Sequence, residues 1–416
     1  MYYYLKWKGS FVFDQGLKET KQEGILMNFI PLCVPNFEGN EKKYVDDAIE
    51  KEWVSTGGAY ITKLEEEMAK YLRVENVAAC QSGTSALHLS LREAGVLPGD
   101  VVIVPPLTFI AAVNPVKYQF ATPVFIDCDD SLCMDPIKLR SFCEEECEWS
   151  DGILKFRGAP VKAIVIVHVF GNMADMEQIM DIAEAYGLKV IEDATEALGT
   201  FYTEGRYKGK SAGSIGDFGC YSFNGNKIIT TGGGGAITSR DPKAVDHLRF
   251  LSTQAKTDPH FYIHDEIGFN YRMTNLQAAL GVAQMEELPE FVRRKQRNYD
   301  QYVQEFEGFE LGSILPFRKG TDSNHWFYSL CIDRDRITTP MRDIILALEE
   351  KKIQTRPIWG LINLQKPYLG EYAYQFEKAP YYADRVINLP CSTSITQEEI
   401  QYVSEEVRKL LRELVR

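Results

Sequence analysis

The sequence of 416 residues has no CxxC pair, no surplus of basic residues and no long apolar run. Without a CxxC pair, a zinc site is not expected. The net charge of −13 leaves no basic excess to neutralise phosphates, which argues against nucleic acid or a membrane surface as a partner. A small anionic substrate stays compatible, because a few local donors bind one. The longest apolar runs, such as residues 163–171, are too short to cross a bilayer.

The nine cysteines are an odd number spread along the chain. Cys143 and Cys147 are the closest pair, and no histidine lies near them in sequence, so we expect no metal site. Since no secretory signal is apparent, the cysteines indicate reduced thiols and a cytoplasmic protein. With 45% hydrophobic and 25% charged residues, the composition is that of a soluble globular protein.

Residues 1–26 differ from the rest of the chain. They contain aromatic and basic residues without a clear period, and they lack the apolar core and cleavage site of a signal peptide. Two interpretations stay open: a short native extension, or a non-native or disordered stretch before a true start at Met27. In both cases we expect these residues to contribute little to the core.

Short apolar runs alternate with amphipathic helical stretches over the next part of the chain. Because these runs are apolar throughout, they predict the strands of a mainly parallel sheet covered on both faces, an α/β fold. The predicted strands are 101–106, 123–127, 163–171, 188–193, 216–223 and 234–239. The predicted helices are 40–54, 59–72, 82–96 and 176–187.

The chain becomes strongly helical from about Met273, and later mixes a strand at 326–332 with two more helices. This pattern is typical of a smaller α+β domain. We therefore expect a large domain over residues 27–282 and a small C-terminal domain over 283–416, packed closely because no low-complexity linker separates them.

The segment with the strongest chemical signal follows the strand at 216–223. A strand ends at Ser222, Lys227 follows five residues later, and the four glycines Gly232–Gly235 close the loop. A lysine can form a Schiff base with an aldehyde cofactor, and a nearby serine hydroxyl can hold a phosphate. Glycines let the backbone approach a ligand closely. The alternative is a solvated lysine beside a flexible turn.

Two other segments add to this signal. Asp193 ends an apolar strand, where α/β sheets present ligand-binding groups, although an aspartate there also suits a helix N-cap. Gly83 and Thr84 follow Ser82 at the start of a predicted helix, where free backbone N–H groups favour a phosphate. Helix capping alone would need the same residues, so each signal is weak by itself.

Five segments occur together in the order and spacing of one enzyme family. They are SGTSALHLSL, PPLTFIAAVNPV, IEDATEALGT, GDFGCYSFNGNKIITTGGGG and GFNYRMTNLQAALG. On these motifs the chain resembles the DegT/DnrJ/EryC1/StrS aminotransferases from about Asn28 to its C-terminus. The resemblance implies fold type I, the aspartate-aminotransferase fold, with pyridoxal 5'-phosphate as the cofactor. The segment SFNGNKIITTGGGG is most similar to the branch that acts on UDP-2-acetamido-2,6-dideoxy-hexos-4-ulose, in bacillosamine and legionaminic acid pathways.

The resemblance also implies roles for residues around the cofactor ring. Lys227 matches the lysine that forms the Schiff base and later moves protons, which makes it the catalytic residue. Asp193 matches the partner of the pyridine nitrogen, and Phe109 matches the aromatic residue that stacks on the ring. Glu196 matches a position, often His or Gln, that contacts the ring hydroxyl oxygen. An ionised glutamate there could not donate a hydrogen bond. The alternative is that Glu196 is only an acidic residue in the first turn of a helix.

The remaining matches concern the phosphate and the substrate. Gly83, Thr84 and Ser222 match phosphate-binding positions, and Asn270 matches a residue that reaches the phosphate from the other subunit. The resemblance thus implies a homodimer with shared active sites. His325 and Arg356 resemble positions near the sugar or nucleotide. The basic run at 293–297 could meet a pyrophosphate, but such runs are more often solvated helix faces.

By resemblance, the expected reaction is a ping-pong transfer of an amino group from L-glutamate to C4 of a nucleotide-linked 4-keto-6-deoxy sugar. A 3-keto sugar or a GDP- or dTDP-linked sugar remains an alternative. A dehydratase on the same scaffold would carry histidine in place of Lys227. A cofactor-binding regulator without turnover is the alternative from another class.

Overall fold

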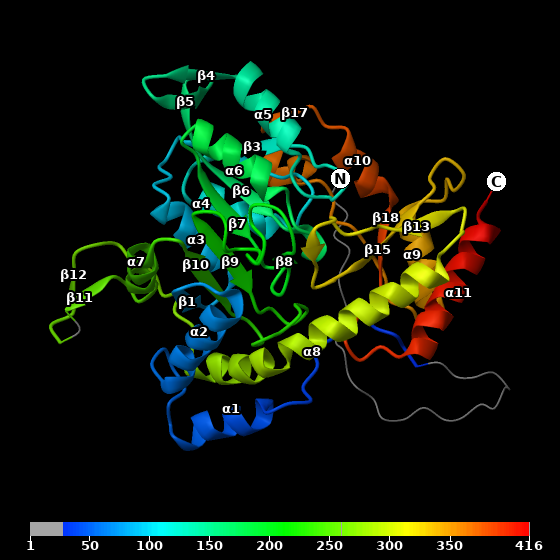
Figure 1. Cartoon of the computed structure of the whole chain (residues 1–416), viewed down its shortest axis with the longest axis horizontal. Helices are drawn as coiled ribbons and strands as arrows, with labels where there is room; N and C mark the ends of the chain where they lie inside the picture. The colour runs from blue at the N-terminus through cyan, green and yellow to red at the C-terminus, as the bar shows by residue number, and fades with distance from the viewer. Residues whose placement is uncertain (1–27, 259, 416) are drawn as a thin grey trace, which may run out of the picture.

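A computed structural model describes residues 28–258 and 260–415 of the protein. The expectations for residues 1–26 and for Met27 lie outside this part of the chain. A ten-stranded sheet and a four-stranded antiparallel sheet form the two layered parts of the molecule. The long helix α8 (Asn275–Glu305) runs beneath the large sheet and on to the small one (Figure 1).

The large sheet has a parallel centre and an antiparallel edge. Its strand order is β1-β10-β9-β7-β6-β2-β3-β17, with parallel pairing from β9 to β17. The strands on this path are β1 (Val77–Cys80), β2 (Val101–Val104), β3 (Thr122–Ile126), β6 (Ala159–Val167), β7 (Lys189–Asp193), β9 (Phe218–Ser222), β10 (Gly235–Ser239) and β17 (Ala373–Tyr374). The hairpin of β4 (Cys147–Ser150) and β5 (Ile153–Phe156) joins β6 beside it.

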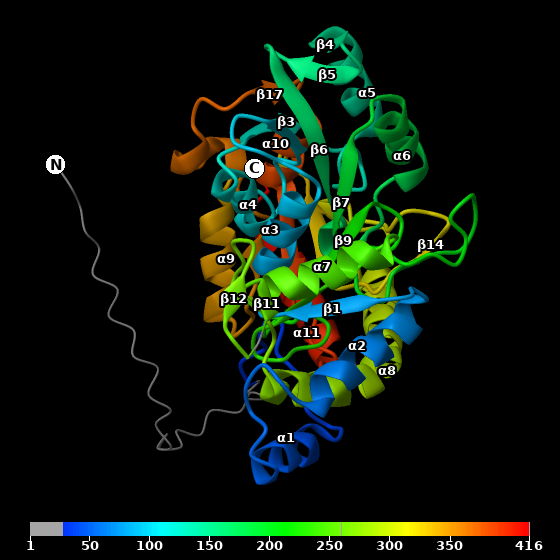
Figure 2. The ribbon, with the colours of Figure 1, turned by 90° about the vertical axis from the view of Figure 1, so that its left-hand side faces the viewer.

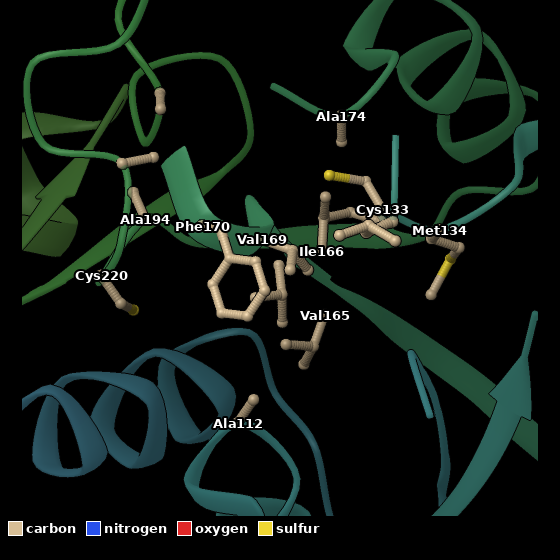
Figure 3. Close-up of a cluster of buried hydrophobic side chains, with 14 of the residues drawn as sticks. Ala112, Cys133, Met134, Val165, Ile166, Val169, Phe170, Ala174, Ala194 and Cys220 are labelled. Carbon is tan, nitrogen blue, oxygen red and sulfur yellow. The ribbon is translucent and has the colours of Figure 1, made fainter. Parts of the chain in front are cut away.

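The apolar runs identified in the sequence form the buried centre of this sheet, as predicted. Strands covered on both faces need apolar side chains in both directions. Figure 3 shows this for β6, where Val165 lies on the side of Ala112 and its neighbour Ile166 lies on the side of Cys133. In Figure 2 the sheet lies between α3 and α4 on one side and α5 and α6 on the other.

The helices agree closely with the periodic segments of the sequence. The 59–72 helix was predicted with the bounds that the structure has, and the others differ by a few residues at their ends. The helices before α8 are α1 (Glu41–Glu50), α2 (Ala59–Leu72), α3 (Gly83–Glu93), α4 (Asn114–Tyr118), α5 (Pro136–Glu145), α6 (Met176–Ala185) and α7 (Pro242–Ser252). Those after it are α9 (Met341–Glu350), α10 (Lys378–Arg385) and α11 (Gln397–Glu413).

The small sheet is antiparallel, with the order β13-β15-β18-β16. Its strands are β13 (Gly312–Ile314), β15 (Tyr328–Ile332), β18 (Val386–Leu389) and β16 (Arg356–Pro357). The expected domain boundary at 282/283 falls inside α8, and β17 returns from the C-terminal part to pair with β3 of the large sheet. The division into two domains stays a prediction, because these connections run across it.

Two further pairs of short strands lie outside both sheets. One is β8 (Phe201–Tyr202) with β14 (Thr321–Asp322). The other is β11 (Lys256–Asp258) with β12 (Ile263–His264), which projects from the body beside α7 (Figure 1).

The parallel arrangement brings several strand ends to one edge of the large sheet. β7 ends at Asp193 and β9 ends at Ser222, and the two strands are parallel neighbours. Helix α3 begins at the same edge, because β1 before it runs in the direction of β9. Ligands of open α/β sheets bind at such carboxyl ends. The fold therefore gathers the chemically distinctive segments at one place.

A buried carboxylate joins the C-terminal segment to the large sheet. Asp127, directly after β3, accepts hydrogen bonds from the backbone N–H groups of Glu377, Lys378 and Ala379 at 2.7–2.9 Å. The Nζ of Lys138 lies 2.7 Å from the same carboxylate. Burial opposes ionisation, but these donors outweigh it and lower the pKa of Asp127 below its usual range.

Replacing this carboxylate should weaken the whole fold. We expect Asp127→Asn to lower the free energy of unfolding by about 3 kcal/mol, because it leaves Lys138 and the amides of α10 without their anion. Since the folded pKa is depressed, the stabilisation exists above the unfolded value of about 4 and is lost as the pH falls through the folded value. Urea unfolding at several pH values measures this.

Asp130→Asn is the matched control for that experiment. Asp130 also pairs with Lys378, but its side chain is 72% exposed. An exposed ion pair contributes less than about 1 kcal/mol. Equal losses in the two variants would contradict a special role for Asp127.

Candidate active site

A cavity of about 390 Å³ lies at the edge where the strand ends meet. It is lined by residues from segments that are far apart in the sequence. The expected cofactor residues among its lining are Gly83, Thr84, Phe109, Asp193, Glu196, Ser222 and Lys227. The structure thus brings together all the expected cofactor-binding residues of this chain except Asn270.

Lys227 lies on the loop between β9 and β10. This loop is closed at its base, where the N–H of Phe223 donates to the carbonyl of Gly234 at 2.9 Å. The N–H of Thr231 donates back to the carbonyl of Phe223 at 3.0 Å. Gly234 has a φ of 139°, which a residue with a side chain rarely adopts. The glycine run therefore gives the loop its shape, and the lysine is not on a free turn.

The amine of Lys227 lies between an acid and an aromatic ring. Its Nζ is 3.8 Å from Oε1 of Glu196 and 4.0 Å from the ring centroid of Trp326. The side chain is only 13% exposed, and this burial lowers the pKa of the amine although the Glu196 and Asp193 carboxylates oppose it. A lowered pKa makes the neutral, nucleophilic amine more available.

Glu196 is suited to exchange a proton with this amine. Burial raises the pKa of Glu196 to about 7, against the opposing effects of Lys227 and of the Phe170 N–H, which donates to Oε2 at 2.8 Å. A carboxyl group that titrates near neutrality can hold or release a proton at working pH. The glutamate therefore has a proton to donate over part of the physiological range.

Asp193 lines the cavity with 3% of its surface exposed. Its Oδ1 accepts the N–H of Thr195 at 3.1 Å, and turns follow it over residues 194–200. No helix begins there, so Asp193 is not a helix N-cap. Burial raises the pKa of Asp193, and a cationic partner in the cavity would favour its charged form.

The start of α3 also lines the cavity. Ser82 caps the helix, since its Oγ accepts the N–H of Ser85 at 3.0 Å, and Gly83 and Thr84 are its first residues. A Cβ on Gly83 would lie 2.9 Å from both the Cβ of Ser222 and the Cγ2 of Thr195. Glycine thus lets the helix start approach Ser222. Free N–H groups and a hydroxyl meet there, as an anion site requires.

An aromatic wall, defined here as Trp326, Phe327 and Trp359, completes the cavity. The rings of Trp326 and Phe327 are stacked, with centroids 4.0 Å apart and planes at 11°. The sequence did not identify Trp326 and Phe327 as site residues, because the segment 326–332 has the apolar character of a buried strand. The strand itself begins only at Tyr328, which leaves the first two residues free to face the cavity.

The two expected substrate residues lie outside the cavity lining. His325 is 5% exposed and packs between the rings of Tyr299 and Phe317, with centroids 4.7 and 4.4 Å away. Burial lowers the pKa of His325 to about 4, so the ring is neutral near pH 7. Arg356 is exposed on β16, and its Nη1 donates to the carbonyl of Thr355 at 2.9 Å.

Asn270 is also absent from the cavity lining of its own chain. It is exposed, and its Oδ1 accepts the side-chain N–H of Gln254 at 3.1 Å. In the basic run at 293–297, Arg293, Arg294 and Arg297 pair with Glu290. The run therefore forms a solvated helix face, which was the alternative to a pyrophosphate contact. Lys295 is the exception, since it is buried and donates to the carbonyl of Trp326 at 2.8 Å.

Comparison with known proteins identifies the family. Residues 35–408 match the DegT/DnrJ/EryC1/StrS aminotransferase family. The chain belongs to this family. It is 36% identical over 375 residues to "Putative pyridoxal phosphate-dependent aminotransferase EpsN" of Bacillus subtilis (strain 168), covering 89% of this chain and 92% of the relative. It is also 36% identical over 386 residues to a GDP-perosamine synthase of Escherichia coli O157:H7, covering 92% and 99%.

Other relatives show the range of the family. A UDP-N-acetyl-3-dehydro-alpha-D-glucosamine 3-aminotransferase of Acidithiobacillus ferrooxidans is 32% identical over 355 residues, covering 84% of this chain and 88% of the relative. The crystal structure of DesI in the presence of its TDP-sugar product superimposes with a TM-score of 0.82 at 25% identity, covering 93% and 94%. The expected fold type I and a pyridoxal-phosphate-dependent aminotransferase are thereby confirmed.

The cavity fits this cofactor. It offers an anion site at the start of α3, a buried carboxylate and a buried amine, which are the groups that a phosphate, a protonated pyridine and an aldehyde need. The close approach of Gly83 to Ser222 leaves no room for a side chain there. Within residues 28–258 and 260–415, no cluster of His, Cys, Asp or Glu is placed to hold a metal ion. No helix in that part of the chain is long and apolar enough to cross a membrane.

The contact between Lys227 and Glu196 should set the basicity of the amine. In Glu196→Gln we expect the pKa of Lys227 to fall by about 1 unit, because a carboxylate at 3.8 Å that favours the ammonium is removed. Trace acetylation of the cofactor-free protein at several pH values reports this pKa, since only the neutral amine reacts. Glu177→Gln, outside the cavity, should leave it unchanged. An unaltered pKa in Glu196→Gln would rule out the coupling.

Proposed function

We propose that the enzyme transfers the amino group of L-glutamate to C4 of a nucleotide-linked 4-keto-6-deoxy sugar, namely UDP-2-acetamido-2,6-dideoxy-hexos-4-ulose. The observation that carries the proposal is the position of the Lys227 amine, which shares one cavity with a buried carboxylate, an anion site and an aromatic wall. The family relatives whose names include nucleotide sugars support this substrate class. Such an enzyme, with nine free cysteines, suits the cytoplasm and the synthesis of surface polysaccharides.

Each residue around the ring has a role in this proposal. The start of α3 with Ser222 holds the phosphate, Asp193 pairs with the protonated ring nitrogen, and Phe109 stacks on the ring. Glu196 shares a proton with the ring hydroxyl oxygen, which its raised pKa of about 7 makes feasible. Bound pyridoxal phosphate supplies the electron sink for the pair of electrons left when a C–H bond breaks.

Lys227 has two successive tasks. Its neutral amine first holds the cofactor covalently, which the lowered pKa favours. With the cofactor bound and Lys227 displaced by L-glutamate, the free Nζ would take a proton from the donor carbon and deliver it to the cofactor carbon. In the second half of the cycle the same Nζ would take a proton from the cofactor carbon and deliver it to sugar C4. Glu196 at 3.8 Å can exchange a proton with it between these steps.

Removing the amine should separate binding from turnover. We expect Lys227→Ala to bind pyridoxal phosphate without a covalent link and to lose transamination by several orders of magnitude, because the proton carrier is missing. Reduction with borohydride and mass spectrometry should detect a lysine-linked cofactor only in the unchanged enzyme. Substantial transamination by Lys227→Ala would contradict the assignment of Lys227 as the catalytic residue.

A second experiment decides between the proposed enzyme and its alternatives. Purified protein with L-glutamate is assayed against a panel of UDP-, GDP- and dTDP-linked 4-keto and 3-keto sugars. The proposal expects the highest kcat/KM with the UDP-linked 4-keto-6-deoxy sugar. A clear preference for a GDP-linked, dTDP-linked or 3-keto sugar would contradict the proposed substrate and identify the preferred sugar in its place. Absence of conversion of the bound cofactor to its amine form by glutamate would favour a regulator.

We also propose a homodimer whose active sites are shared. Phe109 lines the cavity yet is 55% exposed, so the cavity is open to solvent beside Phe109 in the single chain. The projecting β11–β12 hairpin carries Phe261 and Tyr262 with 77% and 73% of their surfaces exposed, and Ile267 nearby is 78% exposed. Such apolar residues on an arm are typical of a surface that another subunit covers. Asn270 follows this arm and would reach the partner's phosphate.

The shared site can be tested by mixing two defective subunits. Asn270→Ala should weaken cofactor binding by roughly tenfold to a hundredfold, the effect of one charge-assisted hydrogen bond, without unfolding the protein. In a mixed dimer with Lys227→Ala, both defects fall in one site and the other site is native. Activity should therefore rise above the sum of the two variants. If subunit exchange is verified and no activity returns, Asn270 does not act across the interface.

A further inference from the structure

Trp326 contacts the loop of Lys227 in two different ways. The face of its ring lies 4.0 Å from the Nζ of Lys227, measured to the centroid. Its indole N–H donates to the carbonyl of Asn226 at 2.8 Å, and Asn226 directly precedes the lysine. One side chain from the C-terminal part of the protein thus contacts both the amine and the backbone that carries it.

The tryptophan is itself held firmly. It is 2% exposed, and its backbone N–H donates to Oδ1 of Asn324 at 3.0 Å. The side-chain N–H of Asn324 donates in turn to the carbonyl of Glu196 at 2.9 Å. Phe327 stacks on the indole at 4.0 Å. Asn324 therefore links the backbone of Trp326 to that of Glu196.

The ring differs from Glu196 in one physical respect. Glu196 favours the Lys227 ammonium only while it is ionised, and its pKa of about 7 means that this support varies near neutral pH. The π face of an indole favours a cation at every pH and takes no proton. Burial works against the ammonium throughout, so a support that does not titrate keeps the charged amine in a defined place.

We propose that Trp326 is a positioning residue for Lys227, whose ring receives the protonated amine while its indole N–H fixes the loop at Asn226. The inference rests on the proposed function, in which Lys227 is free of the cofactor for part of each cycle. When Nζ gains a proton, NH2 becomes NH3+, and the new charge faces the ring. The amine then stays within reach of the carbon to which it returns the proton.

The contribution of the ring is tested in the full chain after removal of the cofactor. Trace acetylation with peptide mass spectrometry gives the pKa of Lys227 in the unchanged protein, in Trp326→Leu and in Trp359→Leu. We expect Trp326→Leu to lower this pKa by about 1 unit, because the cation–π contact is lost. Trp359→Leu removes an aromatic ring from the same cavity and should leave the pKa unchanged. An unaltered pKa in Trp326→Leu, or an equal shift in both variants, overturns the proposal.

The contribution of the indole N–H is tested with Trp326→Phe, which keeps an aromatic ring in a similar volume. We expect this variant to retain most of the Lys227 pKa. Hydrogen exchange of the amides at 224–231 should become about tenfold faster, the effect of losing one hydrogen bond. Unchanged exchange, or a pKa as low as that of Trp326→Leu, contradicts the division of roles. Neither measurement requires transamination, so both test the role of Trp326 even if the proposed function is wrong.

Discussion

The burial of one amine is the constraint on which the rest of the site depends. Taking the ammonium of Lys227 out of water disfavours its charge, and this lowers its pKa. The carboxylate of Glu196 and the ring of Trp326 oppose that effect from 3.8 and 4.0 Å. The balance leaves an amine that can be neutral when it attacks and charged when it carries a proton. Enzymes of this kind need both forms near neutral pH.

The fold meets this constraint by bringing strand ends together. Asp193 and Ser222 end two neighbouring parallel strands, and the glycine-closed loop after Ser222 places Lys227 in the same cavity as both. Gly83 allows the start of α3 to approach Ser222 to within contact distance. The aromatic wall comes from the C-terminal part of the chain, which Asp127 holds to the large sheet. Residues from both parts of the chain therefore line the cavity.

Much of this arrangement could be predicted from sequence because its signals are local. Continuous apolar runs predicted the buried parallel strands, and residues at their ends marked the position of the cavity. The contact of Trp326 with Asn226 could not be predicted, since 100 positions separate the two residues and no local pattern links the segment of Trp326 to the loop of Lys227. His325 sits one residue from the cavity wall but faces Tyr299 and Phe317 instead. Its φ of 50° turns the backbone at that point, which no periodicity reports.

The most direct test of the central claim follows the nitrogen atom itself. The enzyme is supplied with L-glutamate whose amino nitrogen carries a heavy isotope, together with the UDP-linked 4-keto-6-deoxy sugar, and the sugar product is analysed by mass spectrometry. We expect the label to appear in the sugar in equal amount to the 2-oxoglutarate released, because the amine passes from donor to acceptor through one cavity. An unlabelled sugar, or label that never leaves glutamate, would contradict it.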